Sequence, residues 1–102
     1  MPAGNNPLTI TVSHGPQVDR HTVTMADDGD EVIFVPNPQT PDLKFDVYFE
    51  STTPFDNNHF HNRHPDSHRT GKYRSDRKGQ HKYSVTIQGE PVLDPVIIVS
   101  GP

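Results

Sequence analysis

Hydrophobic and polar residues alternate along short segments of the chain, as they do in a β-strand that buries one face. The alternation is strict at residues 8–13, clear at 44–50 and 81–88, and weak at 21–25. Two continuous apolar runs, at residues 32–35 and 96–99, suit strands that are buried on both faces. Pro36 ends the first run, because proline has no N–H group to donate to a neighbouring strand.

Turn-forming residues separate these segments. Eleven prolines and seven glycines interrupt the chain so often that no stretch of a dozen residues combines a helical period with freedom from breakers. The sequence therefore predicts an all-β fold, a Greek-key β-sandwich of about six to eight short strands. A length of 102 residues suits one domain that covers residues 1–102.

Residues 51–77 show no periodicity. A loop of this length is uncommon in a compact domain, and loops that reach it often carry function. We therefore expect an excursion, rich in His and Arg, at about residues 51–80. A short strand pairing around residues 72–74 is expected to interrupt it.

Two segments resemble those that carry the copper ligands in cupredoxins. Residues 29–34 read Gly-Asp-Glu-Val-Ile-Phe and lead through Asn37 to Pro41-Asp42. Residues 79–85 read Gly-Gln-His-Lys-Tyr-Ser-Val, and the spacing from there into residues 96–99 fits without a gap. The resemblance implies a cupredoxin-like sandwich.

The same resemblance argues against copper. A type 1 copper site needs a thiolate and two imidazoles. The positions that correspond to the ligands supply none of these groups, so the resemblance implies an empty former copper pocket. These positions are Asp42, Val85, Gln88 and Leu93.

The sequence also contains Glu90-Pro91 and Asp94-Pro95. This pair resembles the signature of the DP-EP family of small bacterial proteins, which implies the same sandwich and no particular chemistry. From the residues alone, the two prolines stiffen the approach to the last strand, and Asp94 is expected to turn toward backbone N–H groups.

Charge is distributed unevenly along the chain. Residues 63–82 hold seven of the nine Lys and Arg residues and two acids, so this segment carries +5 while the rest of the chain carries −9. Such a segment favours contact with an anionic partner or an acidic protein surface. The expected contact residues are Arg63, Arg69, Lys72, Arg74, Arg77 and Lys78.

The charge pattern leaves two further alternatives open. The positive segment could dock on the acidic residues of a second copy, which would make a homo-oligomer, or it could fold over the acidic residues of its own chain. The strongest acidic cluster comprises Asp27, Asp28, Asp30 and Glu31. Nucleic acid is not expected as a partner, although Phe60, Tyr73 and Tyr83 lie among the cations, because the protein as a whole is acidic.

Residues 59–68 contain four histidines, which suggests a site for Zn, Cu or Ni. The spacing matches no closed zinc site, and Arg63 and Arg69 would repel a cation. A divalent transition metal is therefore the alternative to a cofactor-free protein. Its ligands would be His59, His61, His64 and His68.

Catalysis is not expected. Ser13-His14 and Ser67-His68 are neighbours in sequence, which rarely makes a nucleophile and its base, and the chain has no Cys and no nucleophile elbow. The chain also lacks an apolar run long enough to span a membrane, so we expect a cytoplasmic protein with no membrane partner. Together, the patterns predict a small non-catalytic binding or interaction module, with metal binding through the histidines as the alternative.

Overall fold

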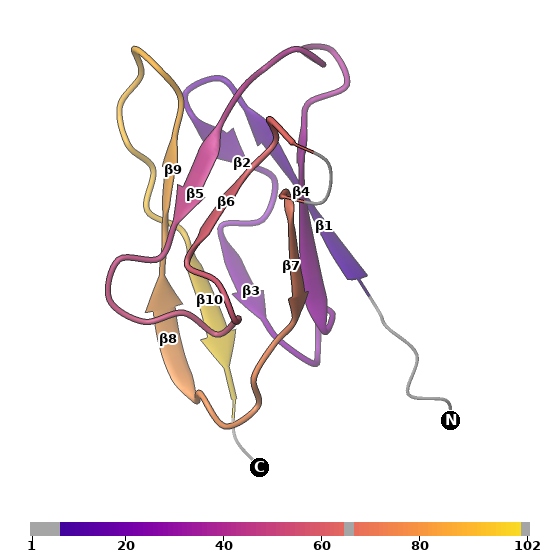
Figure 1. Cartoon of the computed structure of the whole chain (residues 1–102), viewed down its shortest axis with the longest axis vertical. Helices are drawn as coiled ribbons and strands as arrows, with labels where there is room; N and C mark the ends of the chain where they lie inside the picture. Colours follow the sequence, from indigo (N-terminus) through magenta and orange to yellow (C-terminus); the bar gives the residue numbers. More distant parts are fainter. Residues whose placement is uncertain (1–6, 65–66, 101–102) are drawn as a thin grey trace.

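The computed structural model of the chain describes residues 7–64 and 67–100. These residues form an all-β fold with ten strands, which confirms the predicted class (Figure 1). The strands are β1 (Pro7–Ser13), β2 (Gln17–Val18), β3 (Thr22–Thr24), β4 (Glu31–Pro36), β5 (Asp46–Tyr48), β6 (His59–His61), β7 (Arg69–Lys72), β8 (Gly79–Lys82), β9 (Ser84–Thr86) and β10 (Val96–Val99). The described residues contain no helix, and therefore none that could cross a membrane.

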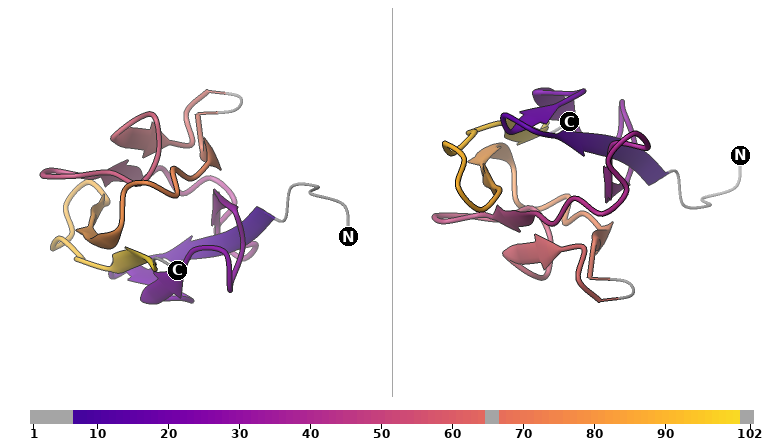
Figure 2. Two further views of the ribbon diagram at one scale, coloured as in Figure 1. Left: turned by 90° about the horizontal axis from the view of Figure 1, so that it is seen from below. Right: turned by 90° about the horizontal axis from the view of Figure 1, so that it is seen from above.

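The strands pair into three sheets, with the orders β2-β1-β4-β7, β3-β10-β8 and β6-β5-β9. The pairs β1–β4 and β3–β10 are parallel, and the others are antiparallel. Figure 2 shows a sandwich-like arrangement of two layers, with β1, β3 and β10 in one layer and β5 and β6 in the other. The radius of gyration is 13.1 Å, the value expected for a folded domain of this length.

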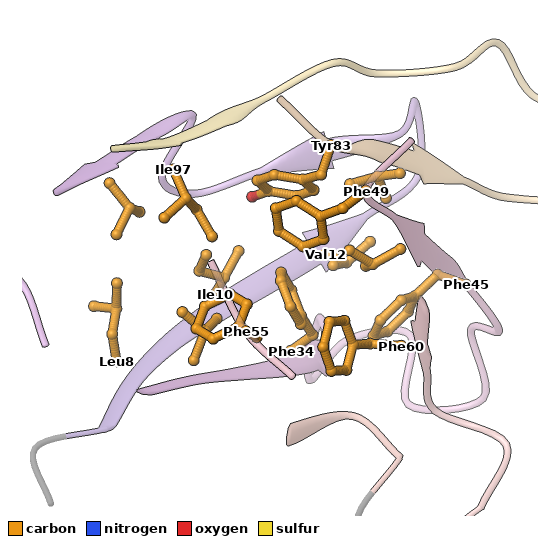
Figure 3. Close-up of a cluster of buried hydrophobic side chains, with 14 of the residues drawn as sticks. Leu8, Ile10, Val12, Phe34, Phe45, Phe49, Phe55, Phe60, Tyr83 and Ile97 are labelled. Carbon is orange, nitrogen blue, oxygen red and sulfur yellow. The ribbon is translucent and has the colours of Figure 1, made fainter. Parts of the chain in front are cut away.

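The core lies between the layers and is built around aromatic rings (Figure 3). The ring centroid of Tyr83 lies 5.0 Å from that of Phe49 and 5.8 Å from that of Phe34. Phe55 and Phe60 meet edge to face at 6.0 Å. Since the chain has no Trp, phenylalanine and tyrosine rings fill the interior that the short strands enclose.

The alternating pattern correctly predicts which faces are buried. In β1, Leu8, Ile10 and Val12 are buried while the residues between them are not. The segment 81–88 alternates as expected, but it forms two strands instead of one. β8 pairs with β10, β9 pairs with β5, and the chain changes sheets at Tyr83.

The stretch 51–80 differs from the expected excursion, because it is built into the sandwich. β6 pairs with β5, and β7 pairs with β4. Phe55 is completely buried and Phe60 is 2% exposed, so both belong to the core. β2, β6 and the division of residues 81–88 raise the number of strands above the expected six to eight.

Candidate functional site

The four positions that correspond to copper ligands do not line one pocket. Asp42 and Gln88 border a hollow of about 510 Å³, together with His14 and Lys44. Val85 is fully buried in β9, and its backbone pairs with that of Leu93 through hydrogen bonds of 2.9 and 3.2 Å. Neither Val85 nor Leu93 lines the hollow.

The acids of the Glu-Pro and Asp-Pro pairs hold the loop before β10 in place. Glu90 accepts one hydrogen bond from the backbone N–H of Gly15 at 2.5 Å and contacts His14 Nδ1 at 2.7 Å. The Gly15 N–H and then His14 lower the pKa of Glu90. Asp94 accepts a hydrogen bond from the Ser84 hydroxyl at 3.2 Å, where backbone N–H groups were expected as its partners.

Three of the four clustered histidines lie near one another. The ring centroids of His59 and His61 are 5.3 Å apart, and those of His61 and His64 are 5.6 Å apart. His59 also stacks on Tyr48, with centroids 4.2 Å apart and an interplanar angle of 8°. His68 precedes β7, where its carbonyl oxygen accepts the N–H of Phe34.

One ring nitrogen of His59 and one of His61 already have partners. His59 Nε2 lies 3.0 Å from Asp46 Oδ1, and His61 Nδ1 accepts the backbone N–H of Arg63 at 3.2 Å. Desolvation, followed by the charge of Arg63, lowers the pKa of His61. Within residues 7–64 and 67–100, no three His, Asp or Glu side chains converge on a point where a metal ion could sit.

Asp46 is the centre of this cluster. Its two oxygens accept hydrogen bonds from Arg63 at 2.6 and 3.0 Å, a bidentate pair that fixes the guanidinium. The hydrogen bond from Arg63 lowers the pKa of Asp46, and the pKa of Arg63 is raised in return. Arg63 is therefore neutralised locally and is a poor contact for an anionic partner.

The other three arginines of the expected contact surface are also engaged. Arg69 lies 3.7 Å from the largely buried carboxylate of Glu31, and Arg74 Nε donates to Asp56 at 2.7 Å. Arg77 Nη1 donates to the carbonyl oxygens of Thr53 and Phe55 at 3.2 and 2.7 Å. These bonds tie β7 and the segment after it to the remainder of the chain.

The lysines differ from the arginines. Lys72, Lys78 and Lys82 are exposed, and none has an ion-pair partner within the part of the chain that the structure describes. Lys72 is the last residue of β7, Lys78 lies in the loop 73–78, and Lys82 is the last residue of β8. Figure 1 shows the loop between β7 and β8 at the lower end of the molecule. We call these three lysines, together with the charged side chain of Arg77, the basic end.

The acidic cluster lies beside the basic segment of the same chain. Glu31 is opposite Lys72 in the pairing of β4 with β7, and the N–H of Tyr73 donates to the carbonyl oxygen of Asp30 at 2.9 Å. With the contact between Arg69 and Glu31, this arrangement favours the intramolecular alternative over docking between copies. Part of the charge asymmetry along the sequence is therefore neutralised within the molecule.

The aromatic rings among the cations are not a platform for bases. Phe60 is 2% exposed and Tyr83 is 1% exposed, so both are core residues, and Tyr73 is half-buried. Stacking of nucleic-acid bases needs exposed ring faces. The described residues offer few such faces near the basic end.

One polar site was not anticipated from the sequence. His81 is 5% exposed, its Nε2 donates to the carbonyl oxygen of Arg77 at 2.7 Å, and the Thr52 hydroxyl lies 2.7 Å from its Nδ1. The signal that could have found it is the alternation through Tyr83, Val85 and Ile87, which places position 81 on the buried face. A buried imidazole needs hydrogen-bond partners, and this one has two.

Comparisons with protein-family models, with curated proteins and with solved structures found no match. The function of this chain must therefore be inferred from its own contacts, charges and cavities.

Proposed function

We propose that this protein is a small non-catalytic binding module, built on a cupredoxin-like sandwich without copper, that binds an acidic protein partner through its basic end. The observation that carries this proposal is the difference between the arginines and the lysines. Arg63, Arg69 and Arg74 are paired with carboxylates, whereas Lys72 and Lys78 are exposed without an ion pair among the described residues.

Exposed cations that are not held in an ion pair attract an acidic partner and raise the rate of encounter. A protein is favoured over a nucleic acid for two reasons. The chain has a net charge of −4, which repels a polyanion outside the basic end, and the rings of Phe60 and Tyr83 are buried. An acidic peptide surface can meet the basic end locally without approaching the acidic remainder.

A pair of double variants with equal net charge tests the proposal. Lys78→Gln/Lys82→Gln removes two cations from the basic end, and Arg20→Gln/Lys44→Gln removes two exposed cations elsewhere. Binding of a labelled poly-glutamate peptide at low salt is followed by fluorescence anisotropy. The first variant should bind about tenfold more weakly, from roughly 0.5–1 kcal/mol for each surface charge, while the second binds like the parent.

An equal loss in both variants would mean that net charge alone controls binding, and would overturn the proposal. Absence of saturable binding by the parent protein at low salt would overturn it as well. Urea unfolding of the parent and of Lys78→Gln/Lys82→Gln should give the same midpoint, because no ion pair of these two lysines is found among the described residues. The control variant loses the exposed contact of Arg20 with Asp28 at 3.8 Å, so its free energy of unfolding should fall by less than about 1 kcal/mol.

A second candidate is binding of Zn, Cu or Ni by His59, His61 and His64. The observation in its favour is the succession of three rings at centroid distances of 5.3 and 5.6 Å on one surface. A metal bound through His59 Nε2 would displace Asp46, and one bound through His61 Nδ1 would displace the Arg63 N–H. Calorimetry with each metal tests this candidate, and the absence of saturable heat below about 10 μM would remove it.

A matched pair of histidine variants makes the calorimetry specific. His61→Ala should abolish any metal heat, since His61 is the central ring of the three. His21→Ala removes an exposed histidine outside the cluster and should leave the heat unchanged. Loss of the heat in both variants would indicate nonspecific binding to surface imidazoles.

A further inference from the structure

A hollow of about 450 Å³ lies beside the buried imidazole of His81, between the chain segments 51–53 and 76–78. Its size is within the range of small-molecule binding sites. We call it the His81 hollow, and its lining is mainly hydroxyl and cationic. The lining residues are Ser51, Thr52, Thr53, Asp76, Arg77, Lys78 and His81.

The cations of the hollow have N–H groups to offer. The two carbonyl oxygens that Arg77 contacts both accept from Nη1, and these bonds fix the guanidinium. The N–H groups of Nε and Nη2 take no part in them. Lys78 is exposed beside it. Asp76 is the single acid in the lining, and Arg77 and Lys78 together outweigh it by one positive charge.

Thr52 and His81 form a hydrogen bond whose direction depends on the charge of the imidazole. His81 Nε2 must carry a proton, because the Arg77 carbonyl oxygen at 2.7 Å can only accept. In neutral His81, Nδ1 is therefore an acceptor, and the Thr52 hydroxyl donates to it at 2.7 Å. The oxygen of Thr52 then presents only lone pairs to the hollow.

Protonation of His81 reverses this hydrogen bond. Nδ1 then carries a proton and donates it to the Thr52 oxygen, so the hydroxyl proton of Thr52 has to find another acceptor. Thr52 is exposed and lines the hollow, so an anion in the hollow can be that acceptor. At the same time the imidazole adds a positive charge behind the hydroxyl.

We propose that the His81 hollow binds a tetrahedral oxyanion, such as sulfate or the phosphate group of a phosphate ester, and that protonation of His81 strengthens this binding through Thr52. Arg77 and Lys78 supply charge-assisted donors, and Thr52 supplies a neutral donor only when the imidazole is charged. This inference goes beyond the proposed function, since a small anion is bound here without any partner protein.

The other charged groups around the hollow are carboxylates and ammonium groups. Asp76 and Lys78 lie on the rim, and Glu50, Lys82 and Asp94 line the neighbouring hollow that shares Ser51 and Thr52. Ile97, which is opposite His81 on the adjacent strand β10, has no charge. Of the side-chain types present, imidazole is the one that ordinarily changes charge between pH 5 and 8.

Sulfate is the probe of choice, because its charge is the same throughout this pH range. Binding to the parent protein is followed by shifts of backbone amide signals in two-dimensional NMR spectra at about pH 5.5 and about pH 7.5. Saturable shifts are expected at residues 51–53 and 76–81, with binding about fivefold tighter at the lower pH. Lys78→Gln should weaken binding at both pH values, and Asp76→Asn should strengthen it at both.

Thr52→Val isolates the role of the hydroxyl, and Thr52→Ser is its matched control. The valine variant should lose most of the fivefold pH effect while keeping the binding that Arg77 and Lys78 provide. The serine variant should retain the pH effect, and it also covers the case in which valine disturbs the fold. The inference would be overturned by shifts that do not saturate, by shifts outside the hollow, or by an unchanged pH effect in Thr52→Val.

The source of the oxyanion is distinguished by two further probes at the lower pH. Equal affinity for inorganic phosphate and for a phosphoserine peptide indicates a free anion, and tighter binding of the peptide indicates a phosphorylated protein. Sulfate binding can fail while the poly-glutamate peptide is still captured, so failure of this inference and failure of the proposed function are separate results.

Discussion

Replacing Tyr83 by phenylalanine should stabilise the protein. Tyr83 is 1% exposed, and its hydroxyl has no hydrogen-bond partner among the described residues. Figure 3 shows this hydroxyl pointing among the carbon atoms of the core near Ile97. Burial, together with the charge of Asp19, raises the pKa of Tyr83 well above its ordinary value, so the side chain is a neutral phenol.

The size of the effect follows from two opposing contributions. A buried polar group without a partner costs about 1–3 kcal/mol of folding free energy, which the phenylalanine variant recovers. Removing the oxygen atom also loses a few close contacts, worth about 0.1–0.2 kcal/mol each. We therefore expect Tyr83→Phe to raise the free energy of unfolding by about 1 kcal/mol, and the melting temperature by roughly 4–8 °C for a domain of this size.

Urea unfolding followed by circular dichroism measures the change in the free energy of unfolding. An equal slope of the transition in both proteins checks that unfolding is two-state. Tyr48→Phe is the control, because Tyr48 is 39% exposed and its hydroxyl can reach solvent. The control should change stability by less than about 0.5 kcal/mol. A loss of about 1 kcal/mol or more in Tyr83→Phe would refute the reasoning, since it would mean that the hydroxyl makes a hydrogen bond in the folded protein.

Three other substitutions test the fold at separate positions. Phe60→Ala should lower the free energy of unfolding by about 3–5 kcal/mol in urea titrations, because Phe60 is buried in the core. An effect below about 1 kcal/mol would mean that residues 51–80 lie outside the core. Thr70→Val should cost about 1–3 kcal/mol, because the buried N–H of Val32 donates to the Thr70 hydroxyl at 2.9 Å, and Thr70→Ser should recover most of this loss. Glu90 has a lowered pKa, so its stabilising contribution is complete above its ordinary value of 4.5 and is lost as the pH falls through the lowered value. Glu90→Gln should therefore show a smaller loss of stability between neutral and acidic pH than the parent, and an identical pH profile would contradict this role.

Local sequence patterns were enough to predict the fold class and the buried faces of the strands. Alternation at residues 8–13 places Leu8, Ile10 and Val12 inside, since the strand period is two and one face must be apolar. The same rule could not show that residues 81–88 serve two sheets. Alternation reports which side of a strand is buried, and the identity of the neighbouring strand depends on contacts far away in sequence.

The strand pairing within residues 51–80 could not be predicted for a related reason. β6 has only three residues, too few to show a period, and Phe55 reaches the core from a loop. An isolated Phe in a polar stretch does not reveal whether the loop turns it inward. The pairing of β5 with β6 and of β4 with β7 settles this in the structure.

Prediction of the site was limited by contacts between distant residues. Asp46 and Arg63 are 17 positions apart, and Thr52 and His81 are 29 positions apart. Counting charges along residues 63–82 identified the cations correctly but could not show that Arg63, Arg69 and Arg74 meet acids from other segments. The lysines can be distinguished from the paired arginines only when these ion pairs are known.

The change of sheets at Tyr83 has a consequence for the way in which the protein opens. β8 is the edge strand of one sheet and β9 is the edge strand of another, and a single buried ring joins them. Edge strands are ordinarily the first to fray, yet detaching either one here would drag Tyr83 out of its contacts with Phe34 and Phe49. The amide hydrogens of β8 and β9 that are bonded to β10 and β5 should therefore exchange with solvent together, at a rate set by global unfolding.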